Sequence, residues 1–437
     1  MLGAQETARC GRKMTWAIII VSTAHALTSS VCAEEPRPLF PVKRDGKWGY
    51  IDRTGAVVIQ PQFDCVARFR EGMAPVSVGA AVCSDWNDED PFGSGPWGYV
   101  DERGAVVIPP RFFQARGFHE GLAGVQFFED GAYGFIDRTG KVVFRLPNNM
   151  HWTGPFSEGL AAVSLFECPY FGPFAYVACT LLGCGYVDRT GRQVIEPRLS
   201  YAGQFCHGLA VAGSGNRYGL INKTGTFVAD DRYEGVGGSI GGLKVPASCP
   251  FHEGLAPVEQ QGRWGFVDTQ GRQVIAPQFE NAMPFSEGLA EVLQGGKWGF
   301  IDRTGTIVVE PQFESTGSFA EGLASVKVQG RWGAIDRTGK MVIPPRFDPL
   351  HEFSEGLAMI RLDEKWGFVD RSGTIVIAPQ FKDARSFRGG LAPVCMAEGP
   401  QIPGDEYHTA ACERQGPSYI DATGHVVWKS AGSSTVN

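Results

Sequence analysis

Residues 297 to 313 read KWGFIDRTGTIVVEPQF, and nearly the same sequence occurs 34 residues before and 34 residues after them. Residues 263 to 279 read RWGFVDTQGRQVIAPQF, and residues 331 to 347 read RWGAIDRTGKMVIPPRF. A fixed period of about 20 to 50 residues is the signature of a repeat architecture. A chain of 437 residues would by length alone suggest roughly two to four ordinary domains. The repetition is the stronger evidence, and it indicates a single repeat architecture instead.

A Trp-Gly or Tyr-Gly pair marks each copy of the pattern, and about ten copies can be counted. The pairs begin at Trp48, Trp97, Tyr133, Tyr218, Trp264, Trp298, Trp332 and Trp366, with degenerate copies at Gly185–Tyr186 and Tyr419. Longer steps between pairs carry insertions. Because the copies fill nearly the whole chain after its N-terminus, we expect one repeat domain over residues 34–430, followed by a disordered tail at 431–437.

Each copy predicts three strands. A first strand such as LASVKV (323–328) is followed by Gln329-Gly330, which suits a tight primed hairpin. A second strand such as KWGFID (297–302) leads into an Asp-Arg-Thr-Gly turn, where Asp302 can accept backbone N–H bonds and Gly305 supplies positive φ. The third strand, TIVVEP, is expected to end at Pro311, because proline cannot donate to the ladder.

The expected fold is all-β, a tandem array of about ten three-stranded β-meander units. The connectors show no helical apolar stripe, and Phe313 and Phe319 are expected to plug the space between units. The array begins and ends on whole three-stranded units, whereas a closed propeller commonly has four-stranded blades and mixes both chain ends in one blade. We therefore favour an open, twisted, solenoid-like stack. A closed propeller-like ring is the alternative.

The N-terminus has the pattern of a secretory signal peptide over residues 1–33. Arg9, Arg12 and Lys13 precede an apolar stretch, and Val31 and Ala33 occupy the small-residue positions before a cleavage site, so cleavage is expected after Ala33. A lipid anchor at Cys32 and an uncleaved membrane anchor are the alternatives. The protein is thus expected to be exported, to the periplasm or the outside of the cell, with no stable transmembrane segment after cleavage.

Charge and cysteine usage fit an exported protein. The formal net charge of −7 makes the chain a poor candidate for nucleic-acid binding. Several cysteines flank insertions, and Cys395 and Cys412 bracket the last one, so we expect a disulfide between these two. No Cys/His spacing indicates zinc. Nine cysteines follow the signal segment, and because nine is odd, at least one thiol is expected to be unpaired.

The repeated acidic residues are interpreted as structural. The Asp that ends each second strand is followed by the Gly that a turn needs, and each Glu that precedes a Gly, as in EGLA, is assigned to a turn as well. A glycosidase needs one pair of carboxylates in distinct environments, which equivalent copies do not supply. No nucleophile, metal or phosphate motif stands out. We predict no catalytic, metal or cofactor-binding residues, no cofactor, and no enzyme.

Candidate binding residues are sought where the copies differ and along one exposed edge. Insertions in repeat proteins map to one face, often the binding face. The insertions carry aromatic residues, and stacked turns would place arginines in a row. The candidate binding surface consists of Trp86, Phe92, Tyr170, Phe171, Tyr407, Arg303, Arg337 and Arg371. For the turn arginines, the competing interpretation is a solvated face paired with neighbouring acids.

The composite pattern WGFIDRTG, IVVEPQF and FAEGLA resembles the WG-repeat, or KWG-repeat, family of bacterial proteins over roughly residues 38 to 428. The resemblance implies a β-repeat protein, often exported, with no common enzymatic activity. The chain departs from the pattern at FCHGLA (205–210), at Asn222 in place of Asp, and at Gly389 in place of Glu.

These observations lead to three functional hypotheses. The first is a non-catalytic exported scaffold that binds envelope protein or polysaccharide. The second is an enzyme, or an enzyme accessory, with a site in disulfide-tied insertions; a cluster of acids and a His in one pocket would favour it. The third is a self-associating surface structure. The sequence does not indicate the oligomeric state.

Overall fold

The computed structural model describes residues 38–79, 95–152, 154–167, 180–238, 249–396 and 416–430. The chain divides into two compact regions, Met1–Arg37 and Pro38–Asn437, and all described residues belong to the second. The predicted signal peptide and C-terminal tail lie outside the described residues. Every described regular element is a β-strand, which confirms the all-β prediction.

Ten repeats follow one another along the chain. Repeats 1 to 3 contain β1 (Phe40–Arg44), β2 (Lys47–Ile51), β3 (Val57–Phe63), β4 (Cys65–Val66), β5 (Met73–Ser77), β6 (Trp97–Asp101), the shared strand β7 (Val106–Ala115), β8 (Leu122–Phe127), β9 (Tyr133–Asp137) and β10 (Val142–Arg145). Repeats 4 to 6 contain β11 (Met150–Trp152), β12 (Leu160–Glu167), β13 (Thr180–Asp188), β14 (Gln193–Leu199), β15 (Tyr201–Ala202), β16 (Leu209–Ser214), β17 (Arg217–Asn222), β18 (Phe227–Tyr233), β19 (Gly235–Val236), β20 (Leu255–Gln260), β21 (Arg263–Asp268) and β22 (Gln273–Phe279).

Repeats 7 and 8 contain β23 (Asn281–Ala282), β24 (Leu289–Gln294), β25 (Lys297–Asp302), β26 (Ile307–Phe313), β27 (Ser315–Thr316), β28 (Leu323–Val328), β29 (Arg331–Asp336) and β30 (Met341–Phe347). Repeats 9 and 10 contain β31 (Leu350–Ser354), β32 (Leu357–Leu362), β33 (Lys365–Asp370), β34 (Ile375–Phe381), β35 (Asp383–Ala384), β36 (Ala392–Cys395), β37 (Ser418–Ile420) and β38 (Val426–Trp428).

Most repeats have four antiparallel strands, one more than predicted. In repeat 8 the extra strand is β27, whose residues Ser315 and Thr316 pair with Lys327 and Val326 of β28. It lies in the stretch that was expected to be a plain connector, and it is too short to show a period-two pattern. The three longer strands form the predicted meander.

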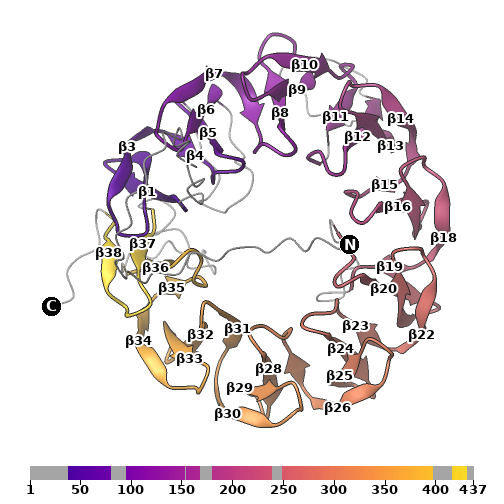
Figure 1. Ribbon diagram of the computed structural model, residues 1–437, viewed down its shortest axis with the longest axis vertical. Coiled ribbons are helices and arrows are strands. Elements are labelled where there is room, and N and C mark those ends of the chain that lie inside the picture. The colour runs from indigo at the N-terminus through magenta and orange to yellow at the C-terminus, as the bar shows by residue number, and fades with distance from the viewer. Residues whose placement is uncertain are drawn as a thin grey trace, which may run out of the picture. The chain divides into compact units, whose positions relative to one another are not determined.

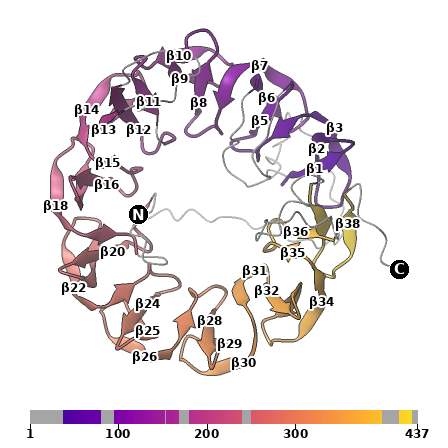
Figure 2. The ribbon, with the colours of Figure 1, turned by 180° about the vertical axis from the view of Figure 1, so that it is seen from behind.

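The last strand of each repeat also runs further than predicted. In repeat 7, β26 continues through Pro311 to Phe313. It is the outermost strand of its sheet, so the proline costs no ladder bond on the open edge. Figures 1 and 2 show β22, β26 and β30 along the outer rim of the repeat array, with β31 and β35 on its inner side.

The glycine of the Trp-Gly pair is explained by an irregularity between β25 and β26. Trp298 pairs with Phe313, whereas Phe300, two residues on, pairs with Val309, so β26 holds two extra residues between these pairs. The bulged chain passes close over Gly299, where an added Cβ would lie 2.5 Å from the carbonyl oxygen of Val309. Only glycine fits beneath such an approach.

The core consists of layers between consecutive repeats. One layer packs Leu289, Phe300, Val309 and Phe313 of repeat 7 against residues of repeat 8. The repeat 8 side of this layer consists of Phe319, Ala324, Val326 and Ile335. The predicted plugs Phe313 and Phe319 are 4% and 2% exposed, which confirms their role. Each repeat is thus stable only against its neighbours.

The first and last repeats also contact each other. The hydroxyl of Tyr419 donates to the carbonyl oxygen of Pro41 over 3.0 Å, and the ring of Tyr419 lies 5.5 Å from that of Phe40. Val42 and Ile51 share a buried cluster with Leu391, Tyr419 and Trp428. Within residues 38–430 the repeats therefore follow one another around a ring (Figure 1).

This closure matches the alternative that the sequence left open, and it differs from the open stack that we favoured. The expectation rested on the whole repeats at both ends, but closure here needs no shared sheet. Repeat 1 packs on repeat 10 through the buried cluster of Val42, Ile51, Leu391, Tyr419 and Trp428. No single sheet of the described residues is closed into a barrel, and the tandem β-repeat class is confirmed.

Candidate functional site

The strands place the loops of every complete repeat at two opposite ends of its sheet. In repeat 8, Leu323 at the start of β28 pairs with Asp336 at the end of β29. The Glu-Gly turn before β28 and the Asp-x-x-Gly turn after β29 therefore lie at one end, which we call the turn face. The hairpin between β28 and β29 lies at the other end, which we call the hairpin face.

The aspartates of the turn face hold their own turns together. One carboxylate oxygen of Asp302 accepts bonds from the backbone N–H groups of Thr304 (2.9 Å) and Thr306 (3.0 Å) and from the Thr304 hydroxyl (2.6 Å). Gly305 has a φ of 87°. The hydroxyl bond and the backbone bonds hold the pKa of Asp302 below its ordinary value. The predicted turn role is confirmed, and Asn222 reproduces it with its amide oxygen.

The glutamates of the turn face do more than form turns, because each reaches the next repeat. Glu287 of repeat 7 accepts the N–H of Gly322 in repeat 8 over 2.9 Å, and Glu321 in turn accepts the N–H of Gly356 over 2.9 Å. We call this contact the carboxylate clamp. Among the described residues it also joins Glu71 to Gly121, Glu120 to Gly159, Glu158 to Gly208, Glu253 to Gly288, and Glu355 to Gly389 and Gly390.

The three candidate arginines lie on these same Glu-Gly turns. Arg337 donates to the carbonyl oxygen of Glu287 in the preceding repeat. A Cβ on Gly254 would lie 3.8 Å from Nη2 of Arg303, and one on Gly322 would lie 3.3 Å from Nη2 of Arg371. At the equivalent place, Lys223 pairs with the carboxylate of Glu158 over 3.1 Å. The structure thus places the arginines one per repeat, each against the turn of the preceding repeat.

The five aromatic candidates fall in three insertions that occupy the same place in three repeats. Trp86 and Phe92 lie between β5 and β6, Tyr170 and Phe171 between β12 and β13, and Tyr407 between β36 and β37. All five lie outside the described residues. In the regular repeats this place is taken by a two-residue hairpin, such as Gln329-Gly330 with φ values of 49° and 77°. The ends of the strands that flank all three insertions lie at the hairpin face.

Exposed apolar side chains occur at the hairpin ends of repeats 3 and 4, which the sequence did not indicate. Phe128, Leu181 and Leu182 are 52%, 44% and 51% exposed. The ring of Phe128 contacts that of Phe113 at 5.4 Å. Nearby, His151 lies between the rings of Tyr133 (4.5 Å) and Phe166 (4.8 Å). The sequence feature that could have indicated these residues is the longer loop at 128–132 and 168–180, where regular repeats have a two-residue hairpin.

A buried carboxylate was also missed. Glu291 of β24 is 5% exposed and accepts bonds from the hydroxyls of Thr316 (2.6 Å) and Ser318 (2.8 Å) in repeat 8. Burial raises the pKa of Glu291, the two hydroxyl bonds oppose that rise, and the charge of Glu352 adds to it. A polar residue at an inward position of the LAEV strand was the signal. The hydroxyls satisfy this carboxylate, which serves the contact between repeats 7 and 8.

The structure describes some of the cysteines for which the sequence made predictions. Cys395 is disulfide-bonded, and its predicted partner Cys412 lies outside the described residues. Cys206 and Cys249 form a disulfide that was not predicted as a pair, and Cys184 is a free, buried thiol, as the odd count required. Within the described residues, no group of three His, Cys, Asp or Glu side chains could hold a metal ion. In the same part of the chain, no helix has the length and apolarity to cross a membrane.

Comparison with known families agrees with this geometry. The model of the WG-containing repeat matches residues 48–80, 97–127, 185–217, 264–298, 298–332, 332–366 and 366–398, which together are more than half of the chain. The chain belongs to the WG-repeat family. The matched segments each begin at or beside the Trp-Gly or Gly-Tyr pair. No curated protein matches this WG-repeat protein.

Solved structures resemble the WG-repeat protein only distantly. A crystal structure of the eukaryotic initiation factor shares 11% identity at a TM-score of 0.48, covering 91% of this chain and 96% of that one. A protein of unknown function from Bacteroides caccae shares 16% identity at a TM-score of 0.22, covering 50% and 92%. PorZ, a surface component of the type-IX secretion system of Porphyromonas gingivalis, shares 9% at a TM-score of 0.24, covering 92% and 52%. These scores add nothing to the fold described above.

Proposed function

We propose that this WG-repeat protein is a non-catalytic, exported scaffold that binds envelope protein or polysaccharide through its hairpin face. One observation carries the proposal. Three insertions, in repeats 2, 4 and 10, all replace the same hairpin between the same two strands. Loops that vary on a rigid repeated frame are where binding residues concentrate.

Two further observations support the choice of face. The residues that recur in every repeat are occupied by turns, clamps and core packing, which leaves recognition to the variable parts. Repeat 3, which lies between the insertion-bearing repeats 2 and 4, adds exposed Phe128 at the hairpin face. Export is supported by the predicted signal peptide and by disulfide-bonded Cys65, Cys206, Cys249 and Cys395, because disulfides persist in oxidising compartments.

The test is affinity capture with the disulfide-intact chain, residues 34–437, from solubilised envelope of its own cell, with protein and glycan read by mass spectrometry. In one variant, residues 84–96 and 396–411 are each replaced by a Gln-Gly pair, as in the hairpin at 329–330. In the matched control, Arg303, Arg337 and Arg371 on the turn face are changed to Ala.

We expect an enriched partner that is lost from the loop variant and kept by the arginine variant. Loss from the arginine variant alone would move the binding site to the turn face. Enrichment of no partner by the unmodified chain would overturn the scaffold proposal and turn attention to substrate screens.

A further inference from the structure

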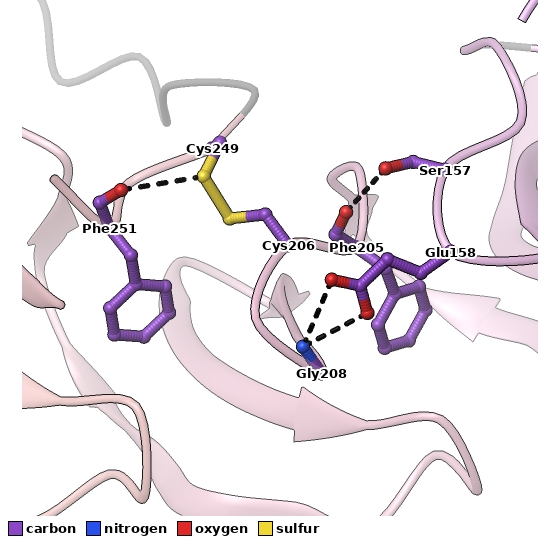
Figure 3. Close-up of a disulfide and its surroundings, with 7 residues drawn as sticks. All are labelled: Ser157, Glu158, Phe205, Cys206, Gly208, Cys249 and Phe251. Carbon is purple, nitrogen blue, oxygen red and sulfur yellow. Dashed lines mark hydrogen bonds between the residues drawn. A yellow bond between two sulfur atoms is a disulfide. The ribbon is translucent and has the colours of Figure 1, made fainter. Parts of the chain in front are cut away.

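Where the turn between the first and second strands of a repeat reads Phe-Ser-Glu-Gly, two hydrogen bonds join the repeat to the next one. Ser157 donates to the carbonyl oxygen of Phe205 over 2.5 Å, while Glu158 accepts the N–H of Gly208 over 3.0 Å (Figure 3). The other two copies repeat the pair of bonds, from Ser286 to Phe319 with Glu287 to Gly322, and from Ser354 to Phe387 with Glu355 to Gly390.

The contact between repeats 5 and 6 lacks both of these groups. Residues 205–208 read Phe-Cys-His-Gly, so Cys206 stands at the serine position and exposed His207 at the glutamate position. His207 keeps the backbone of the turn, with a φ of 53° against 52° for Glu287. Gly254 is the glycine that a glutamate at position 207 would hold if the pattern were kept, and among the described residues no carboxylate clamps it.

A covalent bond takes their place. Cys206 is bonded to Cys249, 43 residues further on, and the sulfur of Cys249 lies 3.6 Å from the carbonyl oxygen of Phe251 (Figure 3). Phe251 precedes the next Glu-Gly turn as Phe205 and Phe319 precede theirs, and the carbonyls of those two accept the serine bond. The disulfide therefore joins the same two places that the missing serine bond would have joined.

We propose that Cys206–Cys249 is a redox-sensitive substitute for the clamp, and that its reduction loosens the contact between repeats 5 and 6 before any other contact of the regular repeats. A dithiol reductant supplies two electrons and two protons; the S–S bond breaks, two thiols form, and the dithiol becomes a disulfide. Cys206 and Cys249 are both only partly buried and pack at the edge of an apolar cluster. Loosening would expose the apolar cluster that includes Val211, Val236 and Phe251.

The test compares two variants by hydrogen exchange. Cys206→Ala with Cys249→Ala removes the bond and leaves neither clamp. Cys206→Ser and His207→Glu with Cys249→Ala restores Phe-Ser-Glu-Gly. We expect peptides over 209–213 and 251–256 to exchange roughly tenfold faster in the first variant than in the wild type, and to return toward the wild-type rate in the second. Peptides over 289–293 and 323–327, around an intact clamp, serve as the internal reference.

The proposal fails if the first variant exchanges like the wild type at these peptides, or if the restored motif brings no slowing. Should the first variant not fold, the wild type and the single variant His207→Glu are compared after reduction with dithiothreitol. Other disulfides open equally in both, so slower exchange at 251–256 in His207→Glu supports the proposal, and equal exchange overturns it.

Discussion

At the scale of single residues, the recurring letters of the repeat are explained by close approaches and satisfied polar groups. Gly299 lies beneath a bulge, Asp302 closes its own turn, and Glu287 reaches a neighbouring backbone. Gly299 acts through its missing Cβ, and Asp302 and Glu287 act through their carboxylate oxygens, so single substitutions can test each role.

We expect Gly299→Ala to lower the free energy of unfolding by about 1–3 kcal/mol or more, because its Cβ would overlap the carbonyl oxygen of Val309. Chemical denaturation measures the change. The matched control is Glu310→Ala on the outermost strand, where the side chain is exposed and the expected effect is within about 0.5 kcal/mol. Equal effects of the two variants would contradict the account of the Trp-Gly pair.

Asp302→Asn should cost less stability than Asp302→Ala, because an amide oxygen closes the equivalent turn at Asn222. The folded-state pKa of Asp302 is lowered, so its advantage over Asn is present above about pH 4 and is lost as the pH falls below that value. Denaturation of both variants at pH 7 and pH 3 measures this. A wild-type advantage over Asn that grew on acidification would have the wrong sign.

Glu291→Gln should raise the free energy of unfolding at pH 7, because the folded-state pKa of this buried carboxyl is raised and its ionisation opposes folding. The wild type is favoured below the unfolded pKa of about 4.3 and loses that contribution as pH rises through the folded pKa. The gain from Gln should therefore shrink at pH 4. Gln can still bond to Thr316 and Ser318. A variant less stable at pH 7 would show that the charge itself is needed.

At the scale of elements, the hairpins show how strongly turn chemistry is imposed. The turn between β24 and β25 uses Gly295-Gly296, with φ values of 60° and 70°. The turn between β32 and β33 adopts the same left-handed conformation at Asp363 and Glu364, with φ values of 48° and 63° and no glycine. The flanking strands therefore hold two ordinary residues where glycine is preferred.

Replacing Glu364 by Gly should stabilise the protein by about 0.5–1 kcal/mol, because glycine adopts this conformation without strain. Thermal unfolding under fixed buffer conditions measures the gain. The reverse change, Gly330→Glu in the turn between β28 and β29, should cost a similar amount. If Glu364→Gly destabilised the protein, a side-chain contact of Glu364 would outweigh the backbone term.

The elements also show how far the sequence could predict the structure. Period, glycine positions and alternation were enough to predict the meander, its turns and the Phe plugs, because these depend on local chemistry. The two-residue strand β27 and the extension of β26 to Phe313 were missed, since bulges and very short strands leave no periodic pattern. Partners across repeats, such as Glu287 with Gly322, could not be predicted, because the sequence of one repeat does not show how the next repeat is positioned against it.

At the scale of the whole repeat region, closure depends on the contact of repeats 1 and 10. Trp428 is 5% exposed and shares the closing cluster with Val42, Ile51 and Tyr419. The Asp-x-x-Gly turn of repeat 1 also rests on repeat 10, since a Cβ on Gly55 would overlap the carbonyl oxygen of Val427 at 2.2 Å. The equivalent Gly305 lies on the preceding repeat too, but against a side chain: a Cβ there would lie 3.2 Å from Cγ2 of Ile275.

Trp428→Ala should lower the free energy of unfolding by roughly 3–5 kcal/mol and should open the closing contact first. Hydrogen exchange would show faster exchange over 40–51 than over 297–302, which lies far along the chain from the change. Trp428→Phe keeps most of the ring and should have the smaller effect. Unchanged exchange over 40–51 would mean that repeat 1 is held without repeat 10.

The contact that closes the array is built from repeat elements: the Asp-x-x-Gly turn of repeat 1 packs on the outer strand of repeat 10, as such turns pack on outer strands between inner repeats. It differs in lacking the carboxylate clamp, because Gly389 stands where repeat 10 would carry the glutamate, and Gly389 packs instead against Pro38. A chain whose ends part would present complementary, unsatisfied surfaces, head and tail. Two such chains could then join end to end, and the count of repeats per turn, rather than the length of one polypeptide, would set the size of the assembly.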